Sequence, residues 1–170
     1  MKNKTIKIVQ LCLSFSLIFI CGCGYTTKAY NLPSSIKTVY IDTFANNSDE
    51  PNIENELRVK LANAFQDEGH IKITDKAAAD TILTGKINSY ARQAMRYAND
   101  ETIEEYRLTI TVNFEFKQVV SQEIIVKANN FTADTSYYLS GSSAKSEKSA
   151  RTDAIDELAH RILNKIVTLW

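Results

Sequence analysis

A run of strictly alternating side chains over residues 105–117 constrains the fold more than any other part of this sequence. Its apolar positions are Tyr106, Leu108, Ile110, Val112, Phe114 and Phe116, and its polar positions are Arg107, Thr109, Thr111, Asn113, Glu115 and Lys117. Successive side chains of a β-strand point to opposite faces, so this period of two predicts a long strand with one buried and one solvated face. Strands are also expected at 81–94 and 123–134, joined to it through a polar loop at 95–104 and a turn at 119–121. The three strands form an antiparallel meander.

The first half of the chain predicts a strand, a helix and a second strand. β-branched and aromatic residues indicate a strand at 36–44. Apolar residues then recur at the four-residue spacing of an amphipathic helix: they are Ile53, Leu57, Leu61 and Phe65. Gly69 marks the end of that helix, and a short strand at 70–74 follows. A helical connection this long brings the two strands together in parallel through a right-handed crossover.

The C-terminal part predicts a loop and a second helix. Residues 135–149 are rich in serine, and we expect a mobile loop there. A helix follows over 150–169, with an apolar stripe of Ile155, Leu158, Ile162, Ile166 and Leu169. The expected fold class is therefore α+β, in the order β-α-β-β-β-α: a mixed sheet of four to five strands with both helices packed on one face.

The N-terminus predicts export and lipidation. Three lysines precede an uncharged stretch at 8–20, which is typical of a signal peptide and short for a membrane span. The stretch ends in Ile20-Cys21-Gly22-Cys23, which resembles the lipobox of bacterial lipoproteins. Cys23 is the expected lipidation site, because Ile20 is too bulky for the cleavage position that lipidation of Cys21 would require. A plain secretory signal is the alternative.

These boundaries divide the chain into a signal peptide at 1–22, a lipidated tether at 23–35 and a single domain at 36–170. Gly24 follows the lipidated cysteine where many lipoproteins retained in the inner membrane have aspartate, which favours the periplasmic side of the outer membrane. A bacterial lipoprotein cysteine carries several acyl chains, and more than one chain gives stable attachment.

The composition of the mature part argues against several classes of function. Without the three lysines of the signal, 17 basic side chains stand against 20 acidic ones, which disfavours a nucleic-acid binder. No cysteine remains besides Cys23, and no glycine-rich phosphate loop or nucleophile motif is found in the sequence. His70 and His160 lack carboxylates at metal-ligand spacing. We therefore expect no catalytic residue, no metal site and no cofactor beyond the covalent lipid.

The solvated face of the meander is the candidate binding surface. Its basic residues are Lys86, Arg92, Arg96, Arg107 and Lys117. Arginine makes paired contacts to phosphate, so a convergence of these side chains would suit an anionic lipid headgroup. Tyr90 or Tyr97 would then lie against acyl or sugar groups. The alternative is an ordinary polar face of mixed charge.

Several segments, in their order and spacing, resemble the LptE family of lipopolysaccharide-assembly lipoproteins. They are Cys23-Gly24-Tyr25, Leu32-Pro33, Ile36–Ile41, Phe44–Asn47, Glu54–Leu61, Ala79-Asp80, Gly85–Ile87, Glu105–Ile110 and Ala154–Trp170. The resemblance covers nearly the whole mature chain. It implies an outer-membrane lipoprotein that plugs the β-barrel protein LptD, binds lipopolysaccharide and helps to transfer it to the outer leaflet, without catalysis.

A second resemblance leaves an alternative open. The opening strand, Phe44-Ala45-Asn46-Asn47 and the following helix are also similar to curli-secretion and peptidoglycan-synthase-activator lipoproteins. That alternative implies a periplasmic regulator or secretion subunit with no lipid ligand. The long alternating hairpin and the C-terminal helix favour LptE. A third possibility is a lipid-binding envelope protein without a barrel partner.

Overall fold

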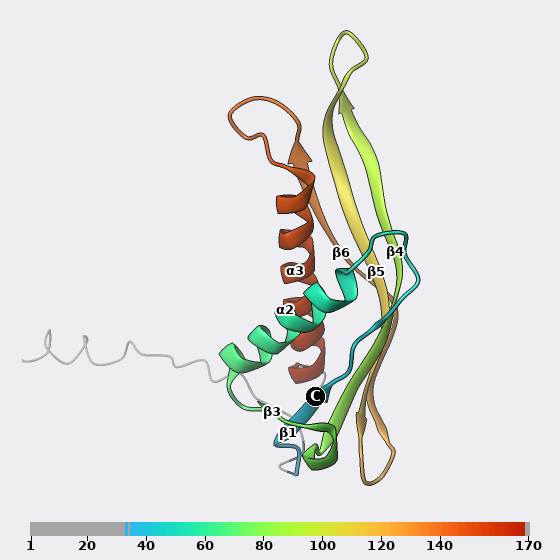
Figure 1. The fold of residues 1–170 in the computed structure, drawn as a ribbon, viewed down its shortest axis with the longest axis vertical. Coiled ribbons are helices and arrows are strands. Elements are labelled where there is room, and N and C mark those ends of the chain that lie inside the picture. Colours follow the sequence, from blue (N-terminus) through green and yellow to red (C-terminus); the bar gives the residue numbers. More distant parts are fainter. Residues whose placement is uncertain (1–32, 34, 169–170) are drawn as a thin grey trace, which may run out of the picture.

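The computed structural model describes residue 33 and residues 35–168, which form one sheet and two long helices (Figure 1). The expected signal peptide and the lipidation site Cys23 lie outside the described residues. Within the described part of the chain, no helix is both long and apolar enough to cross a bilayer.

The sheet is mixed and has six strands. They are β1 (Thr38–Ile41), β2 (Ala45–Asn46), β3 (Lys72–Ile73), β4 (Thr81–Tyr97), β5 (Ile103–Gln118) and β6 (Ile124–Tyr138). The order across the sheet is β3-β1-β4-β5-β6, with β2 pairing separately to β4. The pairs β1–β3, β1–β4 and β2–β4 are parallel, whereas β4, β5 and β6 form the expected antiparallel meander.

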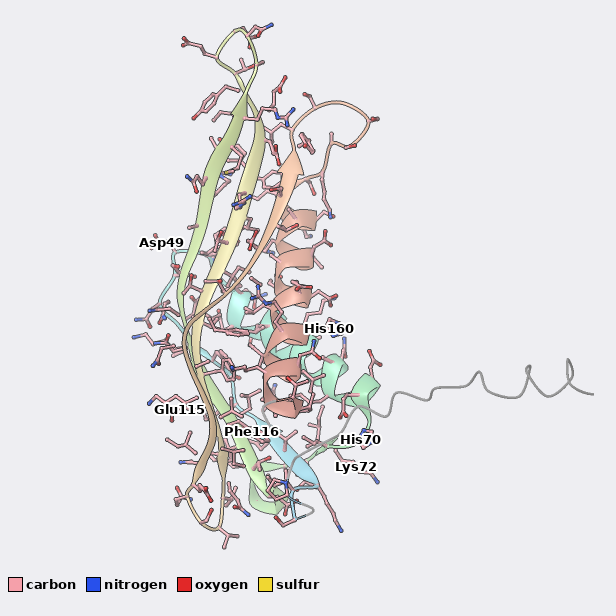
Figure 2. The ribbon with its side chains drawn as sticks, turned by 180° about the vertical axis from the view of Figure 1, so that it is seen from behind. Asp49, His70, Lys72, Glu115, Phe116 and His160 are labelled. Atoms are coloured by element: carbon pink, nitrogen blue, oxygen red, sulfur yellow. The ribbon has the colours of Figure 1, made fainter. Side chains whose placement is uncertain are left out.

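Both helices cover the same face of this sheet, which confirms the α+β class and the layer arrangement (Figure 1). Helix α2 (Ile53–Glu68) buries Ile53, Leu57, Leu61 and Phe65, as the four-residue spacing predicts, and ends at Gly69, whose φ of 80° suits glycine. Helix α3 (Glu147–Val167) packs against β5, β6 and α2. The alternation of β5 has the expected consequence: Phe116 points towards the helices and Glu115 away from them (Figure 2).

The sheet has one strand more than the five predicted, because β1 ends at Ile41, before the predicted end at residue 44, and the chain pairs with β4 again at Ala45–Asn46, beyond the predicted strand. Residues 42–44 leave the sheet before β2 pairs with β4. Phe44 is buried there, and its ring lies over Gly85 on the helix-covered face. The interruption thus places an aromatic ring in the core.

Two predicted loops are shorter than the sequence indicated. β4 and β5 extend to Tyr97 and Ile103, and β6 continues through Tyr138, so that ladder pairing replaces much of the predicted loop. Helix α3 also starts earlier, because the Ser146 side chain caps it by accepting a hydrogen bond from the Ser149 backbone N–H at 3.1 Å. The expectation of a single loop over 135–149 was therefore wrong, and 139–146 remain as the connection.

Candidate functional site

A β-bulge in β4 changes which face its later side chains occupy. Ile87 pairs with Val112, but the next pair is Ser89 with Thr111, so Asn88 is an extra residue. Beyond it the alternation is reversed, and Tyr90 and Arg92 point towards the helices. Lys86, which precedes the bulge, lies on the opposite, helix-free face. The expectation that Lys86 and Arg92 share one basic face was therefore wrong.

A second irregularity returns Arg96 to the helix-free face. Ala94 pairs with Tyr106, whereas Arg96 pairs with Glu105, so the register shifts by one residue between them. The Arg96 Nε lies 3.6 Å from a Glu105 carboxylate oxygen, and its guanidinium is 5.9 Å from the centroid of the Tyr138 ring.

The helix-free face therefore carries four of the five basic candidates, mixed with acids. Lys86, Arg96, Arg107 and Lys117 lie there. The Arg107 Nε is 3.8 Å from an oxygen of Asp134, and further along the same face the Lys127 Nζ is 2.6 Å from a Glu115 oxygen. This is the ordinary polar face of mixed charge that the sequence left open as an alternative.

The fifth candidate, Arg92, lies in a cleft at the N-terminus of α3. The cleft has a volume of about 400 Å³ and is lined by Arg92, Tyr106, Tyr137, Leu139, Lys145 and Glu147, among others. The Arg92 guanidinium lies over the Tyr106 ring, 4.8 Å from its centroid, and is ion-paired with Glu147. Tyr106 and Tyr137 stack on each other with their ring centroids 5.8 Å apart.

Burial, hydrogen bonds and the charge of Glu147 together set the charge states around Arg92. A hydrogen bond with Tyr137 and the nearby Glu147 carboxylate raise the pKa of Arg92 further, so it stays cationic. Burial and the charge of Glu147 raise the pKa of Tyr90, which donates its hydroxyl to Glu147 at 3.3 Å. Burial likewise raises the pKa of Tyr137. Both tyrosines are therefore neutral at physiological pH, and the Tyr137 hydroxyl accepts the hydrogen bond from Arg92.

This arrangement suits the binding of an anion. Arg92 and Lys145 place two cations beside the N-terminal end of α3, where the helix dipole also favours negative charge. In this structure Glu147 is the ion-pair partner of Arg92, and Asp153 is the ion-pair partner of Lys145. A phosphate group entering the cleft would compete with these carboxylates for the two cations and lie against the tyrosine rings.

Sequence reasoning identified Arg92 but missed the residues around it. Tyr106 was assigned only to the core, and Lys145 and Glu147 fell within the predicted loop. Their meeting depends on the extra residue Asn88, and strict alternation contains no signal for a bulge. For metal binding, no group of three or more His, Cys, Asp or Glu comes together among the described residues.

Solved structures with a similar fold include three bacterial proteins. A putative lipoprotein from Caulobacter crescentus is 17% identical, with a TM-score of 0.51 over 75% of this chain and 89% of that one. A minor lipoprotein from Acinetobacter baumannii is 17% identical, with a TM-score of 0.50 over 78% and 94%. The hypothetical protein CT253 from Chlamydia trachomatis is 10% identical, with a TM-score of 0.51 over 77% and 98%. At these identities the similarity establishes the fold alone.

The sequence comparisons give a more specific result. No curated protein sequence matches this chain. The family described as LptE, lipopolysaccharide-assembly, matches residues 36–169, which is nearly all of the domain that begins before β1 and ends after α3. The chain therefore belongs to the LptE family of lipopolysaccharide-assembly proteins.

Proposed function

We propose that this protein is an outer-membrane lipoprotein that plugs an LptD-type β-barrel and binds lipopolysaccharide during its transfer to the outer leaflet. The observation that carries this proposal is the family match over residues 36–169. Cys23 would hold the protein on the periplasmic side of the membrane through its covalent acyl chains. The protein would act by binding and scaffolding, without catalysing a reaction.

The two faces of the sheet suit two different partners. The helix-free face combines Lys86, Arg96, Arg107 and Lys117 with acidic neighbours and polar side chains. Such a surface matches the polar interior that large membrane barrels present. We assign it to the barrel contact, because its cations are dispersed and partly neutralised along the strands.

The Arg92 cleft is the better candidate for lipopolysaccharide. It places Arg92 and Lys145 beside two stacked tyrosine rings, whereas the hollow of about 350 Å³ on the helix-free face places Lys86 and Lys127 beside Glu115. Lipid A phosphates would pair with the cations, and the rings would cover sugar or acyl groups. A phosphate that replaced Glu147 as the ion-pair partner of Arg92 would move the Arg92 side chain and leave the strands unchanged.

Affinity purification tests the barrel proposal. The tagged full-length protein is extracted from outer membranes in mild detergent, and a large β-barrel protein should be recovered with it at equal stoichiometry. If no barrel is recovered and depletion leaves surface lipopolysaccharide normal, the plug proposal fails. Recovery of curli-secretion or peptidoglycan-synthase components instead would support the alternative class.

A matched pair of substitutions tests the lipopolysaccharide site. Arg92→Ala removes the cation of the cleft, and Arg107→Ala removes an equally exposed arginine from the other face. Binding of purified lipopolysaccharide to the immobilised protein should weaken about 10-fold for Arg92→Ala, as expected for one lost charge-assisted contact, and change little for Arg107→Ala. Equal binding by both variants would refute the assignment of the cleft, and circular dichroism confirms that each variant is folded.

A further inference from the structure

The strand β6 forms one edge of the sheet, and the first half of this edge carries features that prevent further strand pairing (Figure 1). Between Ile124 and Phe131 the register with β5 shifts twice, and Lys127 lies on the surface in an ion pair with Glu115. Bulges and lysines of this kind keep other strands from adding to an exposed edge. The opposite edge is protected by its shortness, because β3 has only two residues.

The second half of β6 is regular and has none of these features. From Phe131 to Tyr138 each residue pairs with β5 without a shift in register. This segment contains no lysine, proline or glycine, and its threonine, phenylalanine and tyrosine residues favour strands. Its single charged side chain is that of Asp134, which is 51% exposed. An unprotected and regular edge of this kind allows an extended peptide to add to the sheet.

The hydrogen bonds at the end of β6 show which of its backbone groups face outwards. The Leu139 N–H donates to the Glu104 carbonyl at 2.9 Å, so this pair is bonded across the β5–β6 ladder. Bonded and non-bonded pairs alternate in an antiparallel ladder, so every second residue of β6, counted back from 137 to 131, bonds to β5. The residues between them direct their N–H and C=O groups away from β5, and they are Thr132, Asp134, Ser136 and Tyr138.

The chain itself already pairs with the last of these outward groups. The Lys145 N–H donates to the Tyr138 carbonyl at 2.9 Å, and Ala144 forms a parallel bridge with Tyr138. The connection between β6 and α3 thus adds to this edge at its end. In the part of the chain that the structure describes, the outward N–H and C=O groups of residues 132, 134 and 136 have no backbone partner. Three outward positions of β6 are therefore open to a further strand.

The wall of a membrane barrel cannot supply this further strand. The strands of a closed barrel pair with their neighbours all the way round, so the wall has no free edge. A segment that pairs with β6 must therefore be a loop or a chain end of the barrel protein that lies inside the lumen. Asp134 and Ser136 pair with Thr109 and Arg107, so their side chains continue the helix-free face that we assign to the barrel contact.

We propose that residues 132–136 of β6 bind an extended segment of the barrel partner, which adds to the sheet as a further strand through backbone hydrogen bonds. This inference rests on the proposed plug function and names one way in which the plug recognises its barrel. The bound segment has no acidic side chain opposite Asp134, because like charges on paired strands repel each other. It also has no proline at the positions that donate to β6, since proline lacks the backbone N–H.

Hydrogen exchange at single residues tests the contact in the complex of the full-length protein with its barrel. In the free protein the N–H groups of residues 132, 134 and 136 should exchange fast, whereas β5 protects those of residues 133 and 135. In the complex, exchange at 132, 134 and 136 should become about 10-fold slower or more, because these N–H groups gain acceptors. Unchanged rates there would overturn the proposal. Protection in the free protein that rises with its concentration would identify a second copy as the occupant and would also overturn it.

Two substitutions at one position provide a matched test. Ser136→Pro removes the outward N–H, which an edge strand tolerates, whereas Ser136→Val removes the hydroxyl and keeps the N–H. Recovery of the barrel with the tagged protein should fall about 10-fold for Ser136→Pro and change little for Ser136→Val. Equal recovery with both variants, each shown by circular dichroism to be folded, would contradict the proposal.

The wild-type protein separates this proposal from the plug function. If it recovers no barrel, the plug function and this contact fail together. If it recovers the barrel but residues 132, 134 and 136 exchange as fast as in the free protein, the plug function stands and this contact alone is refuted. The exchange measurement requires no substitution, so this result does not depend on whether Ser136→Pro folds.

Discussion

At the scale of single residues, one glycine shows how tightly the core of this domain constrains sequence. Gly85 lies on the helix-covered face of β4, where the buried ring of Phe44 covers it. A Cβ atom at this position would lie 2.3–2.6 Å from three carbons of that ring. The reason for glycine at this position lies in the chain between β1 and β2, which places the Phe44 ring over it.

We therefore predict that Gly85→Ala destabilises the domain by about 1–3 kcal/mol, because the added methyl group overpacks the core against Phe44. The free energy of unfolding in urea measures the effect. Phe44→Leu serves as the control background, since it removes the ring atoms that meet the new Cβ. In that background Gly85→Ala should reduce the free energy of unfolding by less than it does in the wild-type protein. An equal reduction in both backgrounds would show that backbone entropy or β4 pairing, rather than the Phe44 ring, causes the loss of stability.

At the scale of elements, the bulges of the sheet account for the main errors of the sequence analysis. Alternation predicted the strands and the face of every β5 side chain, because β5 keeps its period from Glu105 to Lys117. It failed for β4, where the bulge at Asn88 moved Arg92 to the helix side. A bulge adds one residue to a strand without altering its composition, so the sequence pattern on either side remains that of a strand.

One side chain of β5 ties two bulges together. The Asn113 side-chain oxygen accepts a hydrogen bond from the Asn88 side-chain amide and another from the Asn130 backbone N–H, both at 2.8 Å. Asn88 is the extra residue of β4, and Asn130, with a φ of 50°, lies in the irregular part of β6. Because Asn88 sets the face of Arg92, Asn113 indirectly positions the candidate site.

Asn113→Val should destabilise the domain by about 1 kcal/mol, although valine favours strands more than asparagine does, because the Asn88 and Asn130 donors lose their acceptor. Thr111→Val, on the same face of the same strand, is the matched control and should be neutral or stabilising. Thermal unfolding measures both variants. If the two substitutions have the same effect, the shared acceptor does not stabilise the bulges.

At the scale of the whole molecule, contacts between α2 and α3 join the two halves of the sequence. Helix α2 belongs to the parallel β1-α2-β3 unit, whereas α3 follows the antiparallel meander. Arg151 of α3 pairs with Glu50, which precedes α2, and with Glu56 within it, the latter at 2.7 Å. Its side chain is only 17% exposed. Sequence patterns predicted both helices and their shared face, but an ion pair between residues this far apart depends on how the layers pack.

A second ion pair between the same helices provides a direct comparison. Lys60 of α2 lies 2.8 Å from Asp156 of α3, but these side chains are 31% and 46% exposed. Solvent screens such a pair, so Lys60→Met should change the free energy of unfolding by about 0.5 kcal/mol or less. Arg151→Met removes the shared partner of two half-buried carboxylates and should cost about 1–3 kcal/mol, since Glu50 and Glu56 then repel each other without a counter-charge.

The two variants should also differ in which part of the domain loses stability. If Arg151 holds the halves together, hydrogen exchange in Arg151→Met should accelerate first in α2, while the β4–β5–β6 meander keeps its protection. Adding Glu50→Gln and Glu56→Gln to Arg151→Met removes the repulsion and should recover part of the stability. If Arg151→Met and Lys60→Met lower the free energy of unfolding equally, the buried Arg151 ion pairs contribute no more than the exposed Lys60 pair. Apolar packing between α2 and α3 would then be what joins the two halves.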